Sequence, residues 1–104
     1  MENLNYLERV KNIANELSSM NEDDLRVYFE DALDVEYRID GAGNYKSVAI
    51  TMTYGGPHIE IDTEDRAVKI WWIDDKAQWS ISNETAEAID QIFNDYYDCI
   101  RKQI

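Results

Sequence analysis

The hydrophobic period changes twice along this chain, and that change is the strongest constraint on its fold. Apolar residues recur every three or four positions over residues 4–20, which predicts an amphipathic helix. Between residues 35 and 81 the period is two, as in strands that bury one face. Residues 83–102 return to the helical period. This order favours a mixed fold over an all-helical or all-strand one.

Local signals mark two further helix starts. Residues 21–33 form a shorter predicted helix, with Asn21 as its N-cap and three acids in its first turn. Ser82 is the predicted N-cap of the last helix, which ends with Arg101 and Lys102. Acids near the start and bases near the end both stabilise a helix through its dipole.

Short turns separate the strand-like runs. They occur at residues 41–44, at 55–57, at Glu64 and Asp65, and at 74–76. Connections this short join antiparallel neighbours. The sequence therefore predicts an α+β fold, in which an antiparallel meander of four to five strands carries two N-terminal helices and one C-terminal helix, mainly on one face. With no linker or repeat, residues 1–104 are expected to form a single domain.

The strongly negative charge of the chain limits the kinds of partner that it can bind. The 104 residues carry 22 acidic and 10 basic side chains, a formal charge of −12, yet 44% are hydrophobic, too many for a disordered acidic tail. Such a surface repels nucleic acid and anionic lipid, so we expect no direct nucleic-acid or membrane binding. A single cysteine excludes an internal disulfide, and the chain start has no leader-like apolar stretch. We expect a cytoplasmic protein.

The acids are concentrated in three segments. The net charge is −6 over residues 21–40, −4 over 60–75 and −5 over 84–98, whereas the remaining residues sum to +3. Carboxylates form rows within two of these segments. We expect the carboxylates of these rows to bind a basic partner. They are Glu60, Asp62, Glu84, Glu87, Asp95 and Asp98.

The spacing of the acids along the predicted strand and helix places them in rows. Glu60 and Asp62 share one strand face, about 6.6–6.8 Å apart. The four acids of the last helix fall along one stripe, and no lysine is interspersed as it would be on a helix stabilised by ion pairs. The alternative interpretation is a polar face that only keeps the protein soluble.

Two adjacent tryptophans must face opposite sides of a strand. Val68, Ile70 and Trp72 share a face, so we expect Trp72 in the core and Trp71 exposed. An exposed Trp71 is a candidate anchor for a partner, because tryptophan buries a large rigid area on binding. Packing within an aromatic ladder is the alternative.

No motif indicates catalysis. His58, Glu60 and Asp62 are metal-ligand types, but residues along one strand face stand in a line and do not converge, so we predict no metal site and no other cofactor. Cys99 lies among apolar helix residues and is expected to be a buried hydrophobe. Gly55, Gly56 and Pro57 lack the lysine and following helix of a phosphate loop. We do not expect an enzyme.

The run from Tyr54 to Thr63 (YGGPHIEIDT), followed by VKIWW at residues 68–72, resembles small acidic accessory proteins of phages, plasmids and integrative elements. The resemblance covers about residues 48–97. These accessory proteins include anti-CRISPR and antirestriction inhibitors. The resemblance implies a role but no particular functional residue: blocking the nucleic-acid-binding surface of a host defence nuclease as an acidic DNA mimic. The expected partner is a basic nucleic-acid-binding protein, foremost a CRISPR effector nuclease.

Two other functions fit the same composition. An immunity protein or antitoxin would neutralise a cognate nuclease toxin through the same attraction between an acidic surface and a basic one. A regulatory module would bind a basic protein segment by adding a strand to a sheet edge.

Overall fold

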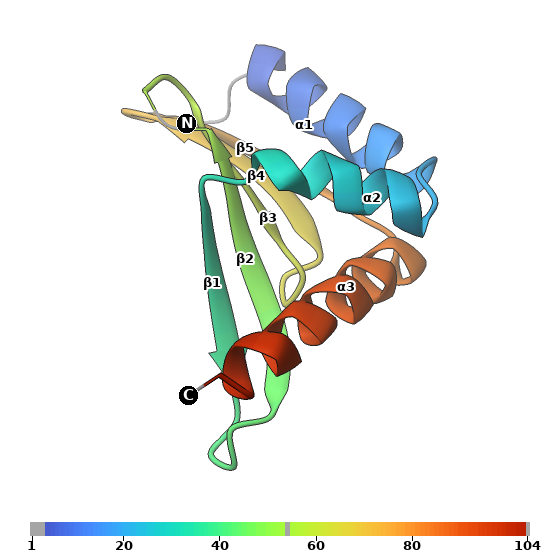
Figure 1. The fold of residues 1–104 in the computed structure, drawn as a ribbon. Coiled ribbons are helices and arrows are strands. Elements are labelled where there is room, and N and C mark those ends of the chain that lie inside the picture. The colour runs from blue at the N-terminus through green and yellow to red at the C-terminus, as the bar shows by residue number, and fades with distance from the viewer. Residues whose placement is uncertain (1–3, 54, 104) are drawn as a thin grey trace.

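A computed structural model describes residues 4–53 and 55–103 and shows the predicted α+β fold (Figure 1). The helices are α1 (Leu4–Ser18), α2 (Glu22–Tyr28), a 3₁₀ turn η1 (Phe29–Asp31) and α3 (Asn83–Arg101). The strands are β1 (Asp34–Ile39), β2 (Tyr45–Thr53), β3 (His58–Asp62), β4 (Ala67–Trp72) and β5 (Asp75–Ser80).

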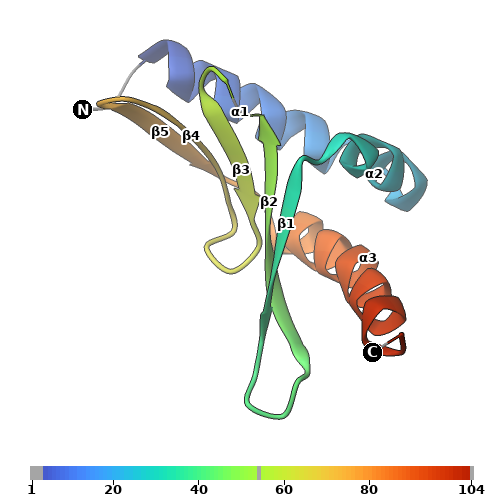
Figure 2. The same ribbon diagram turned by 60° about the vertical axis from the view of Figure 1, so that its left-hand side comes forward.

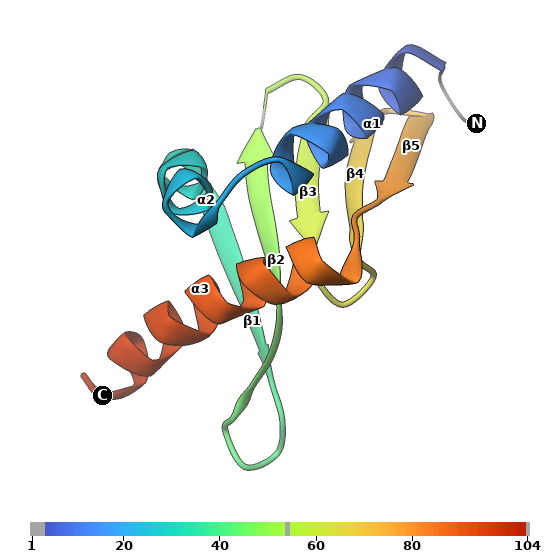
Figure 3. The same ribbon diagram turned by 90° about the vertical axis from the view of Figure 1, so that its right-hand side faces the viewer.

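The five strands form one antiparallel sheet in the order β1-β2-β3-β4-β5, which confirms the predicted meander. All three helices lie on the same side of the twisted sheet and leave its other face open (Figure 2). α1 crosses β4 and β5, whereas α3 crosses β2 (Figure 3). We call the uncovered side the open face.

Alternation along the strands places the core between the sheet and the helices. The register sets Ile50 of β2 opposite Ile61 of β3, and Ile61 opposite Val68 of β4; all three are fully buried. Val10 and Leu17 of α1 and Ile89 and Ile92 of α3 pack into the same cluster. Burial of each such side chain stabilises the fold by about 1.5–3 kcal/mol.

Both predicted helix caps are present. The Asn21 side chain accepts a hydrogen bond from the backbone N–H of Asp24 at 2.8 Å. Ser82 accepts one from the backbone N–H of Thr85 at 3.1 Å. The α-helix that begins after Asn21 is shorter than predicted, because α2 ends at Tyr28 and the chain continues as η1.

Two predictions of burial are wrong. Trp72 faces the helices as expected but is 45% exposed, because it stands at the end of β4 beside the hairpin loop, outside the main cluster. Cys99 is exposed rather than buried, because it lies near the end of α3, beyond Phe93, the last buried residue of that helix. Tyr54, predicted to extend the second strand, lies outside the described residues.

Among the described residues, no helix has both the length and the apolar composition that crossing a bilayer requires.

Candidate partner-binding surface

The outer side of α3 carries the predicted row of carboxylates. Ile89, Ile92 and Phe93 turn inward to the core, which leaves the opposite side of the helix to solvent. The predicted acids on that side are all exposed: Glu84, Glu87, Asp95 and Asp98. At 1.5 Å per residue the row is about 21 Å long.

One acid of α2, Glu22, is joined to this row. Arg26 of α2 donates to Glu22 of its own helix and to Asp95 of α3, each at 3.3 Å, and its guanidinium lies 5.5 Å from the centre of the Tyr96 ring. One cation therefore joins the two helices. We call their exposed carboxylates the acidic helix surface; it comprises Glu22, Asp23, Asp24, Glu84, Glu87, Asp95 and Asp98.

Arg26 is the only basic residue of residues 21–31 and 83–100, and Arg101 and Lys102 follow Asp98 at the end of α3. Exposed ion pairs of this kind contribute little to stability. Four of the seven acids stand in the first turn of their helix and stabilise its dipole, whereas the fold has little use for the other three, Glu87, Asp95 and Asp98. Like charges three or four residues apart on a helix are in fact destabilising. The α3 row is visible in the sequence; the three acids of α2 are clustered there too, but stabilisation of the helix dipole is enough to explain them.

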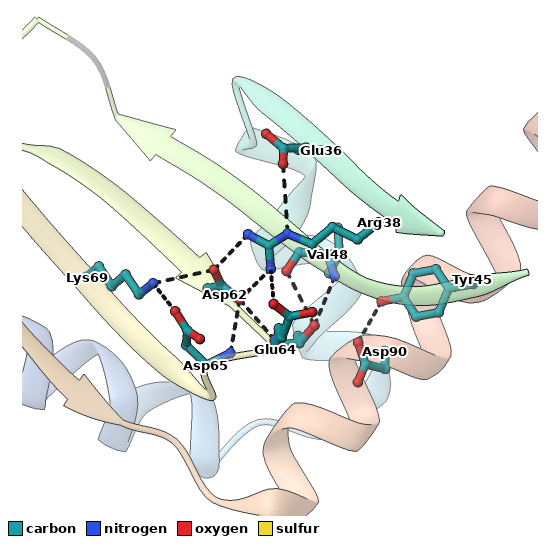
Figure 4. A network of polar contacts seen from close by, with 10 residues as sticks. Glu36, Arg38, Tyr45, Val48, Asp62, Glu64, Asp65, Lys69 and Asp90 are labelled. Carbon is teal, nitrogen blue, oxygen red and sulfur yellow. Dashed lines mark hydrogen bonds and ion pairs between the residues drawn. The ribbon is translucent and has the colours of Figure 1, made fainter. Parts of the chain in front are cut away.

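Asp62 is a structural residue, and its predicted place in an exposed acidic row is wrong. Only 2% of its side chain is exposed. Arg38 donates to both carboxylate oxygens, at 2.9 and 3.0 Å, and Lys69 lies 3.5 Å away (Figure 4). The backbone N–H groups of Glu64 and Asp65 donate to the same carboxylate. These five donors leave it nothing to offer a partner.

The electrostatics of Asp62 match this role. Burial by itself raises the pKa of the carboxyl, but the hydrogen bonds from Arg38 and from the backbone of Asp65, together with the charge of Lys69, outweigh burial and hold the pKa at about 2. The same pairing raises the pKa of Arg38. The pair is charged at neutral pH, and it ties β1 to β3 across β2.

Glu60 stays partly exposed on the open face, opposite Lys69 in the β3–β4 register. Burial and the neighbouring charge of Asp62 raise its pKa. Because the open face is turned away from the helices, Glu60 is separated from the acidic helix surface by the sheet (Figure 2). The structure thus joins the helical acids but does not bring Glu60 to them.

Trp71 lies on the open face, 37% exposed, so its predicted exposure is confirmed. The His58 ring stacks on it, with 4.1 Å between centroids and 15° between planes. A pocket of about 460 Å³ opens beside the indole. It is lined by Lys69, Ile70, Trp71, Lys76, Ala77 and Gln78.

The His58–Asp62 run does not form a metal centre. Within residues 4–53 and 55–103, no group of three or more His, Cys, Asp or Glu side chains is placed to hold a metal ion. Stacking directs His58 toward Trp71, whereas Arg38 and Lys69 engage Asp62.

Comparison with known proteins finds no match: no family model, no curated protein and no solved structure is significantly similar to this chain.

Proposed function

We propose that this protein inhibits a cytoplasmic host defence nuclease, in particular a CRISPR effector, by placing its acidic helix surface in the nuclease's nucleic-acid-binding channel. One observation carries the proposal. The seven carboxylates of the acidic helix surface are exposed on two helices that Arg26 joins through Glu22 and Asp95, and the fold has little use for three of them, Glu87, Asp95 and Asp98.

A positively charged channel is the partner that fits such a surface. RNA-guided nucleases hold their nucleic acids in channels of this kind and read a short adjacent motif with arginines. Carboxylates form strong, charge-assisted hydrogen bonds with guanidinium groups. The net charge of −12 would also accelerate the encounter with a basic protein through long-range attraction.

The contrast with Asp62 supports the same proposal. Where this chain uses a carboxylate for folding, it surrounds the group with donors, as Arg38 and two backbone N–H groups do. Among the described residues, Glu87 and Asp98 have no comparable set of donors, and each lies three residues from another acid of α3, so like-charge repulsion there opposes folding. Retaining them is explained by binding rather than by stability.

The experiment compares two variants that lose the same charge. The first, Glu84→Gln/Glu87→Gln/Asp98→Asn, neutralises three acids of the acidic helix surface. The control, Glu8→Gln/Glu16→Gln/Asp34→Asn, neutralises three exposed acids on α1 and β1. Both are assayed for inhibition of DNA cleavage by a panel of purified effector–guide complexes, and their folding is checked by thermal melting.

We expect the first variant to lose inhibition while melting close to the wild-type temperature, because relief of like-charge repulsion within α3 offsets the loss of Glu84 at the positive end of the helix dipole. The control should inhibit as the wild type does. Equal inhibition by all three proteins would exclude the acidic helix surface as the contact. A wild-type protein that inhibits no effector would exclude this function and direct the search to a cognate nuclease toxin.

A further inference from the structure

The end of the β4–β5 hairpin exposes three consecutive large apolar residues. Trp71 is 37%, Trp72 45% and Ile73 83% exposed, whereas Val68 and Ile70 earlier in β4 are fully buried. Trp71 faces the open side of the sheet and Trp72 the other side, so the adjoining exposed pair is Trp72 and Ile73. Scattered single apolar residues on a surface need no explanation, but adjoining ones indicate an interaction site.

The turn that closes the hairpin holds an isoleucine in a left-handed backbone conformation. Trp72 pairs with Asp75, so the loop consists of two residues, Ile73 and Asp74. Ile73 adopts φ +56°. Two-residue hairpin turns place glycine, asparagine or aspartate at this left-handed position, because a β-branched side chain collides with its own backbone there. The chain therefore keeps a strained residue in the turn of the hairpin, where its side chain is 83% exposed and contributes little packing to the free protein.

The end of the hairpin offers a partner both a projecting side chain and a pocket. Ile73 projects at its tip, and the 460 Å³ pocket beside Trp71 lies on its open-face side. Trp72 faces the same side as the helices, so a partner seated over α2 and α3 could extend toward it. The hairpin end and the C-terminus of α3 lie at opposite ends of a molecule 43 Å long (Figures 1 and 2).

We propose that Trp72 and Ile73 form a second, apolar contact with the same nuclease, inserting into an apolar pocket beside its positively charged channel. This proposal rests on the proposed function. The occupant follows from charge: with a pI of about 4.2, the chain repels a second copy of itself and anionic lipid, and it attracts a basic protein. The inhibitor would thus be held at two places, one electrostatic and one apolar.

The test uses Ile73→Asn and Trp72→Ala, with Ile39→Asn as control, because Ile39 is a half-exposed isoleucine on β1 at the far edge of the sheet. Affinity for the inhibited effector is measured over a salt series, and melting temperature is measured in parallel. Ile73→Asn should weaken binding about tenfold or more, as at an interface hot spot, and raise the melting temperature by about 4–8 °C. Trp72→Ala should weaken binding similarly, whereas the control should bind normally.

The salt series separates the two contacts. The hairpin variants should retain the wild-type salt dependence, whereas the triple amide variant of α3 should lose most of it. Normal binding by both hairpin variants, with inhibition intact, would overturn the hairpin contact and leave the proposed function standing. A lower melting temperature for Ile73→Asn would remove the strain argument, and a wild-type dimer that Ile73→Asn dissociates would make a second copy the occupant. Failure of the wild type to bind any effector would overturn both proposals.

Discussion

Replacing Arg38 by methionine should expose how much the fold depends on the buried carboxylate of Asp62. The substitution keeps an apolar stem of similar length but removes the two hydrogen bonds at 2.9 and 3.0 Å. Asp62 would remain buried, with only Lys69 and two backbone N–H groups to stabilise its charge.

The pKa of Asp62 gives the magnitude. Its value of about 2, against an ordinary 3.8, corresponds to about 2.4 kcal/mol of stability at neutral pH. Removing one member of a buried pair costs about 3–5 kcal/mol. Because Lys69 remains and Arg38 is itself 30% exposed, we expect Arg38→Met to lose about 2–3 kcal/mol.

The assay is urea unfolding at a series of pH values. A carboxyl whose pKa is lowered on folding stabilises the protein above its unfolded pKa, and this contribution disappears as the pH falls through the folded value. The wild-type and Arg38→Met stabilities should therefore differ most above about pH 5 and converge as the pH falls toward 2. The control is Arg26→Met, which breaks only exposed ion pairs and should cost much less. Equal losses for the two variants, or a gap that does not depend on pH, would refute this reasoning.

Three further changes test the packing. Ser82→Ala should destabilise the protein by about 1 kcal/mol in thermal or urea unfolding, because the backbone N–H of Thr85 loses its cap; an unchanged midpoint would contradict that role. Ile61→Ala should cost about 2–5 kcal/mol by opening a cavity in the central strand, and a loss below 1 kcal/mol would contradict its place in the core. Ser47→Ala should be neutral or stabilising by up to about 1 kcal/mol, since the Ser47 hydroxyl is buried without a hydrogen-bond partner among the described residues; a clear loss would reveal a contact for it.

The architecture could be predicted because it depends on local patterns. The change of hydrophobic period separates helices from strands, and short turns make a meander the simplest topology. The caps at Asn21 and Ser82 depend on a few neighbouring residues, and both are present. The orientation of Trp71 follows from strand alternation alone, which is why its exposure was predicted correctly.

The predictions that were wrong depend on contacts between distant segments. Arg38 reaches Asp62 across β2, over the small residues Ser47 and Ala49 on the same face, and only the strand register brings these groups together. Trp72 shares a face with Ile70, but its burial depends on where the helices stop covering β4. The meeting of the α2 and α3 acids likewise results from helix packing.

The most direct test of the account is the affinity of the wild type and of Glu84→Gln/Glu87→Gln/Asp98→Asn for an effector–guide complex, measured from low to high salt with and without competing target DNA. We predict that wild-type binding weakens steeply with salt and is displaced by DNA, and that the variant binds weakly at every salt concentration. Wild-type and variant proteins that bind equally well, unaffected by salt and by DNA, would contradict it.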